Sequence, residues 1–463
     1  MKKTISVFLC ALLCISFALP SLAENDTLRC YFAINEQDAG WQAFSARHPG
    51  VRLEHSNEVY YQNTAEMSQA LLTGEMRCDV LGVTTLSIDP LPMMEKGYLA
   101  DLSADPQIQE ALQRMYPAVR DAVTVQGKIY ALPCSAQINY LRIDRAVWEE
   151  AGLDTAHIPD TAEALLTFLE DWCARMETDP VEGVSIVANL DPMLYTAATY
   201  TKILTEWLIE SYYMQTQYAG QPVEFAPDTL IPLLSRCQEI GRRLYQIERH
   251  PLDATGFGKT LLVQEQRPYW AADYRDVVFL RFSENQPKLF LTYLNLCALP
   301  EGAEHQAMAL ELLGDLAAHP DASKSLLLFS DAGLVMQPHY EANRANMEYW
   351  IGERERHLHS DQLTEDTRMN LEDNLLRLRA SLAKMDTDEG KYVMTQQKLD
   401  EYRQYVAPYL FIQRPDGFFA LCTEDHTALE KLQKQFSENV IDAHQLITEL
   451  NRVGLMMRLE RGR

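Results

Sequence analysis

Residues 127–154, which read GKIYALPCSAQINYLRIDRAVWEEAGLD, decide the fold of this chain. Two short β-prone runs, 123–125 and 128–131, flank Gln126-Gly127, and this arrangement predicts a β-hairpin. Leu132-Pro133 is expected to end the strand pairing, because proline has no N–H to donate to a ladder. The segment therefore opens with a hairpin that closes one structural unit.

The second half of the segment predicts a strand and then a helix. Residues 136–143 are extended and apolar, and residues 145–151 predict a helix that ends at Gly152, a residue type favoured at helix C-termini. This order of hairpin, Tyr-Ala-Leu-Pro, strand and Glu-Glu-Ala-Gly-Leu-Asp resembles the first interlobe crossing of the extracellular solute-binding proteins of ABC importers. The resemblance is to family 1, which contains many sugar binders.

The resemblance implies an α/β, two-lobed periplasmic-binding-protein-like fold with a hinge between the lobes and a helical C-terminal extension. A chain of 463 residues is too long for one hydrophobic core, which agrees with two lobes. The expected division is a leader at 1–23, a first lobe at 24–138 that returns at 271–330, and a second lobe at 139–270. Residues 331–463 are expected to complete the second lobe and to supply the extension.

The mature N-terminus has its own α/β pattern. Apolar runs at 28–34, 51–55 and 78–83 predict strands, and residues 38–48 and 64–72 predict the helices between them. A β-α-β-α-β order implies right-handed crossovers and a mostly parallel sheet.

The first 23 residues predict a secretory leader. Lys2-Lys3 precede an apolar core at 5–19, and Ser21 and Ala23 are the small residues of a cleavage site. Cys10 and Cys14 each follow a leucine, so lipidation is not expected. The protein is therefore expected to be exported, to a periplasm or to the medium.

Charge and cysteine content exclude several classes of function. The formal net charge of −25 opposes binding to nucleic acid. Seven cysteines follow the leader without any Cys-x-x-Cys spacing, so they are expected to be small buried residues, and no disulfide pairing is assigned.

No catalytic, metal or cofactor signature is present in the sequence. It has neither a Gly-x-Ser-x-Gly elbow nor a His-Glu-x-x-His pair. Catalytic residues, metals and cofactors are therefore not expected. The alternative from another class is an extracellular glycan-active enzyme with a carboxylate pair that no motif marks.

The expected ligand site combines loops at the carboxyl ends of strands with the crossing segment. Ligands of α/β lobes collect at such ends. Aromatic faces suit the C–H surface of a sugar, while hydroxyl, amide and carboxylate groups suit its hydroxyls. The candidate ligand-binding residues are Trp41, Tyr60, Thr84, Thr85, Ser135, Gln137, Tyr140, Trp270 and Asp273.

The expected function is capture of a small organic solute by closure of the lobes, with a sugar or oligosaccharide favoured. Apart from Arg275 nearby, these loops contain no arginine, which indicates a neutral or weakly cationic ligand. The expected partners are the transmembrane subunits of an ABC permease, and the protein is expected to be a monomer. A second alternative is a sensor-input protein that hands its ligand to a membrane receptor.

The C-terminal third contains one amphipathic pattern. Leucines at 371, 375, 378 and 382 form a helical stripe within residues 364–385, which is expected to pack against the second lobe, the alternative being a coiled-coil partner site.

Overall fold

The structure is a computed structural model that describes residues 27–31, 34–55, 61, 63–181, 183–187, 196–247, 259–359, 363–412 and 428–460. The predicted leader, the candidate ligand residue Tyr60 and Cys422 lie outside the described residues.

Most described strands join one mixed sheet of nine strands, ordered β2-β1-β3-β10-β6-β8-β7, with β9 also on β6 and β11 on β10. A separate pair, β4 and β5, forms a hairpin. The strands are β1 (Thr27–Tyr31), β2 (Arg52–His55), β3 (Val80–Thr84), β4 (Thr124–Val125), β5 (Lys128–Ile129), β6 (Ala131–Ile143), β7 (Val184–Val187), β8 (Lys259–Arg267), β9 (Val277–Val278), β10 (Phe290–Ala298) and β11 (Leu410–Ile412).

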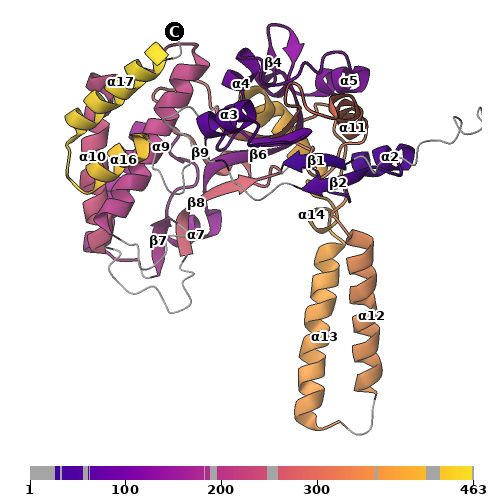
Figure 1. Cartoon of the computed structure of the whole chain (residues 1–463). Helices are drawn as coiled ribbons and strands as arrows, with labels where there is room; N and C mark the ends of the chain where they lie inside the picture. Colours follow the sequence, from indigo (N-terminus) through magenta and orange to yellow (C-terminus); the bar gives the residue numbers. More distant parts are fainter. Residues whose placement is uncertain are drawn as a thin grey trace, which may run out of the picture.

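Helices cover both faces of this sheet (Figure 1). They are α2 (Ala39–Arg47), α3 (Thr64–Thr73), α4 (Leu91–Glu95), α5 (Pro106–Arg114), α6 (Pro117–Ala122), α7 (Arg145–Glu150), α8 (Ala162–Thr178), α9 (Ala197–Tyr218), α10 (Pro227–Ile247), α11 (Gln306–Ala318), α12 (Tyr340–Leu358), α13 (Glu365–Met385), α14 (Asp388–Lys391), α15 (Gln396–Glu401), α16 (Ala428–Ser437) and α17 (Ala443–Glu460). Short helical turns of other types are η2 (Tyr274–Asp276), η3 (Tyr402–Val406) and η4 (Ala407–Tyr409).

The N-terminal α/β pattern is confirmed. Strand β1 pairs in parallel with β2 on one side and with β3 on the other, and helices α2 and α3 make the crossovers. The carboxyl ends of these three parallel strands therefore meet at one edge of the sheet, as the sequence predicts.

The hairpin and the helix of the 127–154 segment are also confirmed, but the prediction that pairing stops at Pro133 is wrong. Gln126 and Gly127 have φ angles of 52° and 80°, the geometry of a tight hairpin turn. Pro133 lies inside β6, opposite Leu296. The ladder between β6 and β10 shifts register next to Leu296, and this irregularity accommodates a residue without an N–H.

Two hydrophobic core clusters divide the described chain, and β6 runs from one to the other. Ile138 and Tyr140 belong to the first cluster, whereas Leu141 and Ile143 belong to the second. Figure 1 shows the two groups of elements, with α9, α10 and α17 on one side and α3, α4 and α11 on the other. The two-lobed α/β fold class is thus present.

The range 331–463, expected to complete the second lobe, is divided between the two clusters. Tyr402 and Leu410 pack in the first cluster, whereas Phe436 and Leu446 pack in the second. The exact lobe boundaries stay a prediction.

Helices α12 and α13 form a long hairpin that projects away from both lobes (Figure 1). Helix α13 packs on α12 and projects with it away from both lobes, so the expected packing against the second lobe is wrong. Only Leu375 of α13 is buried. The helical period predicted an apolar face correctly, but it carried no information about which surface covers that face.

Among the described helices, none has an apolar stretch of the length that a bilayer crossing requires.

Candidate functional site

The two faces of β6 differ in chemistry because neighbouring residues of a strand point to opposite sides. Ala136, Ile138 and Tyr140 are buried in the first core. Ser135 and Gln137, with Asn139 after them, are only partly buried and lie on the other face. The crossing strand therefore presents polar side chains on one side along the line where the two lobes meet.

Neighbouring strands extend these groups into a continuous polar surface, here named the amide row. Gln266 Nε2 donates to Gln137 Oε1 at 2.7 Å, and Asn295 Nδ2 donates to Ser135 Oγ at 2.7 Å. Gln264 Nε2 lies 3.4 Å from Asn139 Oδ1. The amide row consists of Ser135, Gln137, Asn139, Gln264, Gln266 and Asn295.

The amide row is open to water. Strand β8 pairs with β7 only between Lys259 and Leu262, so at the exposed Gln264 and Gln266 it pairs with β6 alone. The exposed amides therefore mark a part of the sheet that the lobes leave uncovered.

Helix α9 of the second lobe approaches the amide row. Trp207 lies in the second core and is 7% exposed, and its Nε1 donates to Gln264 Oε1 at 3.4 Å. Trp207, Glu210, Gln264 and Asn139 line a cavity of about 70 Å³ at this place. An indole, a carboxylate and two amides thus meet in a cavity whose remaining lining is mostly apolar.

Glu210 is the one carboxylate in the lining of this cavity. Burial, and secondly the charge of Glu206, raise its pKa from 4.5 to about 7. Within the described part of the chain, Glu210 forms neither a hydrogen bond nor an ion pair, whereas Glu206 lies 3.5 Å from Lys202. Burial and then the charge of Glu210 raise the pKa of Tyr293, which faces Gln137 across the ladder. Glu210 therefore has acceptor capacity that a bound molecule can use.

Two predicted residues at the end of β3 lie beside the amide row. Thr84 is opposite Asn295, which brings it next to the Asn295–Ser135 hydrogen bond. Thr85 is buried, and its hydroxyl accepts the N–H of Leu294 at 2.9 Å. Thr85 therefore joins β3 to β10, while Thr84 is the more accessible of the two.

Three predicted aromatic residues lie in the first core, and one of them, Tyr140, also lines the cavity beside Asn139 and Trp207. Trp41 is 6% exposed and packs against Phe44. Trp270 is 1% exposed, and its ring centroid is 4.9 Å from that of Tyr140. Tyr140 is on the opposite face of β6 from Gln137, because the two residues are an odd number of positions apart. The ligand role predicted for these rings stays a prediction.

The hydroxyl of Tyr140 belongs to a charged group on that opposite face. It donates to Glu265 Oε2 at 2.7 Å, and Arg142 donates to Glu265 Oε1 at 2.9 Å. Burial would raise the pKa of Glu265, but these two hydrogen bonds, with the charges of Arg142 and Arg267, outweigh it and hold the pKa below its usual value. The group ties β6 to β8 where the chain passes between the lobes.

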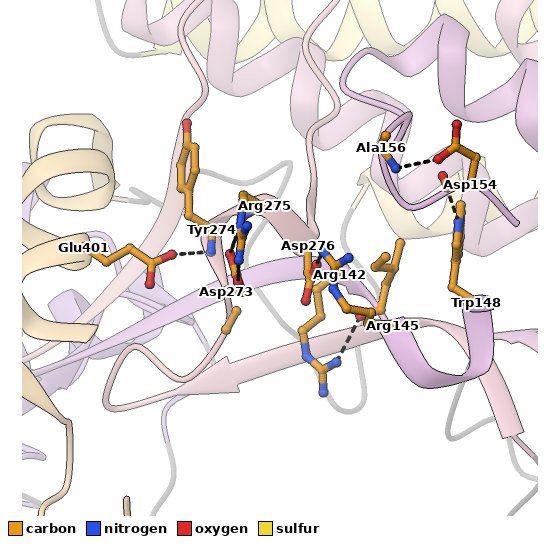
Figure 2. A network of polar contacts seen from close by, with 12 residues as sticks. Arg142, Arg145, Trp148, Asp154, Ala156, Asp273, Tyr274, Arg275, Asp276 and Glu401 are labelled. Carbon is orange, nitrogen blue, oxygen red and sulfur yellow. Dashed lines mark hydrogen bonds and ion pairs between the residues drawn. The ribbon is translucent and has the colours of Figure 1, made fainter. Parts of the chain in front are cut away.

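Asp273 is engaged within its own loop (Figure 2). Its carboxylate accepts two hydrogen bonds from Arg275, at 3.0 and 2.6 Å, and these lower its pKa to about 2. The backbone N–H of Tyr274 beside it donates to Glu401. Asp273 therefore stabilises the segment between β8 and β9, and its predicted contact with ligand stays a prediction.

A second, larger hollow of about 440 Å³ lies at the other edge of the first lobe. It is lined by Arg29 within β1, by the end of α3 and the segment that leads to β3, including Asp79, and by residues 300–304 after β10. Asp79 already accepts the backbone N–H groups of Arg29 and His305. Because ligands of α/β sheets bind at the carboxyl ends of strands, this hollow is the weaker candidate.

Sequence reasoning missed six polar or aromatic residues of this site. The missed residues are Asn139, Trp207, Glu210, Gln264, Gln266 and Asn295. Some signal was present, since Gln264-Glu265-Gln266 alternates within β8 and Glu210 interrupts the apolar pattern of α9. The residues on the strands come together only through the register in which β6 pairs with β8 and β10, and the sequence of a single strand does not reveal that register.

No family model matches the sequence, and no curated protein matches it either. Solved structures do match the fold. The GacH receptor of Streptomyces glaucescens, solved unliganded and with acarbose, is 12% identical, with a TM-score of 0.50, covering 93% of this chain and 98% of that one.

Two further neighbours have the same architecture. A sugar transporter protein from Rhizobium etli in an open conformation is 14% identical, with a TM-score of 0.51, covering 92% of this chain and 98% of that one. An ABC substrate-binding protein from Listeria monocytogenes in complex with cycloalternan is 11% identical, with a TM-score of 0.50, covering 94% and 98%. The resemblance seen in the sequence is confirmed at the level of the fold: this chain has the two-lobed architecture of the solute-binding proteins of ABC importers.

Proposed function

We propose that this protein is an exported solute-binding protein that captures a sugar or oligosaccharide between its lobes and delivers it to an ABC permease. The observation that carries the proposal is the amide row, which faces Trp207 and Glu210 of the second lobe across the crossing strand. The structural neighbours support it, since one is described as a sugar transporter and the other two as complexes with acarbose and with cycloalternan.

The chemistry of the surface suits a polyhydroxylated, uncharged ligand. Side-chain amides both donate and accept hydrogen bonds, as sugar hydroxyls do. The Trp207 indole is 7% exposed, so its flat face becomes available to a sugar ring only when the lobes open. The cavity lining contains no lysine or arginine in the described chain, so an anionic ligand has no partner there. Glu210 accepts from hydroxyl groups and also tolerates a weakly cationic ligand.

Closure of the lobes gives the site its selectivity. Ser135, Gln137 and Thr84 belong to the first lobe, and Trp207 and Glu210 to the second, so only a ligand that contacts both sets favours the closed form. Hinge closure is the general behaviour of periplasmic binding proteins. Binding at about 1 μM requires about −8 kcal/mol, which several hydrogen bonds and one stacked ring supply after ordering costs.

The function is tested by titration calorimetry of the purified protein with a panel of neutral mono- and oligosaccharides. The proposal predicts that at least one sugar binds and is recovered unchanged. Trp207→Ala and Gln137→Ala should each weaken that binding, while Gln238→Ala, far from the amide row in α10, serves as the matched control. Hydrolysis of the sugar would instead support a glycan-active enzyme, and no binding by any sugar of the panel would contradict the proposal.

A further inference from the structure

Two cysteines from different parts of the chain are in direct contact in the first lobe. Cys134 on β6 and Cys297 on β10 place their sulfur atoms 3.2 Å apart, and the thiol of Cys134 points at Cys297 Sγ. These strands are neighbours in the sheet, so the contact is fixed by the ladder and not by a surface loop.

The contact depends on the irregularity in the ladder. Cys297 is paired with Leu132 and Leu296 with Pro133, while Asn295 is paired with Ser135. Cys134 therefore has no partner in the register, and the bulge turns its side chain toward Cys297. A bulge is a usual way to re-aim a side chain in a sheet.

The two thiols differ in access. Cys297 is 2% exposed, whereas Cys134 is only partly buried. The hydrogen bond with Cys134, and then burial, raise the pKa of the Cys297 thiol. Cys134 is thus the sulfur that an external reagent reaches, and Cys297 is the sulfur placed to react second.

We propose that Cys134 and Cys297 form a disulfide when the folded protein meets a small external disulfide. The Cys134 thiolate attacks one sulfur of the reagent, releases one thiol and forms a mixed disulfide. Cys297 then loses its proton, attacks Cys134 Sγ and releases the second thiol. Two protein thiols are oxidised to one disulfide, and the reagent disulfide is reduced to two thiols.

Other described cysteines are less suited to pairing. Cys173 and Cys237 are buried in the second core and belong to different helices. Cys30 and Cys78 are buried in the first core, where burial raises both pKa values, that of Cys78 to about 12. Neither pair combines a sulfur–sulfur contact with an accessible member.

The crosslink would join β6 to β10 wholly within the first lobe. Both cysteines pack on the first core, and the amide row starts one residue further along at Ser135. The disulfide should therefore fix the floor of the proposed site without tying the two lobes to each other. Ligand affinity is expected to change by less than about threefold on oxidation, since no ligand-facing side chain is consumed.

The test treats the folded, reduced full chain with oxidised glutathione, quenches free thiols with an alkylating agent, and maps disulfides by mass spectrometry of non-reduced peptides. The proposal predicts one peptide pair joined through Cys134 and Cys297, and its loss on reduction. A pair formed by other cysteines, or alkylation of both Cys134 and Cys297 after treatment, would overturn it.

Two variants distinguish disulfide formation between Cys134 and Cys297 from reaction of Cys134 alone. Cys297→Ala should stop the reaction at the mixed disulfide, so glutathione stays on Cys134. Cys134→Ser, at a partly exposed position, should leave Cys297 unmodified. If the wild-type protein itself retains glutathione on Cys134, Cys297 is not placed to react and the proposal is wrong.

Discussion

Gln266 on β8 donates its side-chain amide to the side-chain oxygen of Gln137 on β6 at 2.7 Å, and both residues lie on the uncovered face of the sheet. The two strands are the ones through which the chain passes between the lobes. A hydrogen bond between two accessible amides adds little stability, because water competes for both groups. The pair is better explained as a hydrogen-bond donor and acceptor held in position for a bound molecule.

The first prediction concerns Gln137. Replacement by alanine should weaken binding of the cognate sugar about tenfold, equal to about 1.4 kcal/mol, because one hydrogen-bonding side chain of the site is lost. The free energy of unfolding should change by less than about 1 kcal/mol, because the residue is partly exposed. Calorimetry and urea unfolding of the same variant give both values. Arg267→Ala, on the opposite face of β8, is the control, and equal weakening by both variants would contradict the assignment of the face.

The second prediction uses the raised pKa of Glu210. Its carboxyl keeps a proton in the folded state up to about pH 7, whereas the unfolded chain releases it near pH 4.5. The unfolded state then binds fewer protons, so this group makes the folded protein less stable as pH rises from about 4.5 to 7, by about 1–3 kcal/mol. Urea unfolding at pH 4.5 and pH 8 should show that Glu210→Gln is relatively more stable than wild type at the higher pH.

Asp273→Asn supplies the contrast for that measurement. Its folded pKa is lowered to about 2, so its contribution to stability is present above its ordinary value of 3.8 and is lost as pH falls toward 2. Between pH 4.5 and pH 8 the difference between this variant and wild type should stay nearly constant. A Glu210→Gln difference that is equally flat would show that Glu210 is not a buried acid.

The third prediction concerns Trp270. Its ring is almost fully buried against Tyr140 and Phe290, so Trp270→Ala should lower the free energy of unfolding by about 3–5 kcal/mol through the cavity it leaves. Urea unfolding measures this loss. The affinity of the folded Trp270→Ala variant for sugar then shows whether the Trp270 ring also contacts the ligand, as the sequence suggested. Unchanged stability would contradict its place in the core.

The fourth prediction concerns the α12–α13 hairpin. Its two ends meet at the base, where the Tyr340 hydroxyl donates to Asp386 Oδ1 at 3.1 Å. Replacement of residues 341–385 by a few glycines should therefore leave the melting temperature of the two lobes within about 3 °C and sugar affinity unchanged, since projecting segments contribute few buried contacts. Loss of soluble protein or of binding would show that the hairpin supports the lobes.

The sequence allowed correct prediction of the architecture because each part of it depends on local signals. Gln126-Gly127 predicted a tight turn, and Gly152 predicted a helix end. Thr161 predicted a helix cap, and its hydroxyl accepts the Ala164 N–H at 3.1 Å. Pro133 was misjudged because the bulge that accommodates it is made by a strand more than 150 residues away.

The candidate site was less predictable, because its residues become neighbours only through the register in which the strands pair. Ser135, Gln137 and Thr84 were identified, and the structure brings them to the same face and edge. Tyr140 was identified too, and it lies in the first core and also lines the cavity. Residues such as Trp207 and Gln264 become neighbours only when α9 lies over β8, and no pattern along the chain contains that information.

The most direct test of the account is a crystal structure of the protein grown with the sugar that binds best in calorimetry. The account predicts sugar density between the lobes, with hydroxyls within hydrogen-bond distance of Gln137 and Glu210 and one ring face against Trp207. Sugar density confined to the hollow beside Arg29 and Asp79, or a ligand that contacts only one lobe, would contradict the central claim.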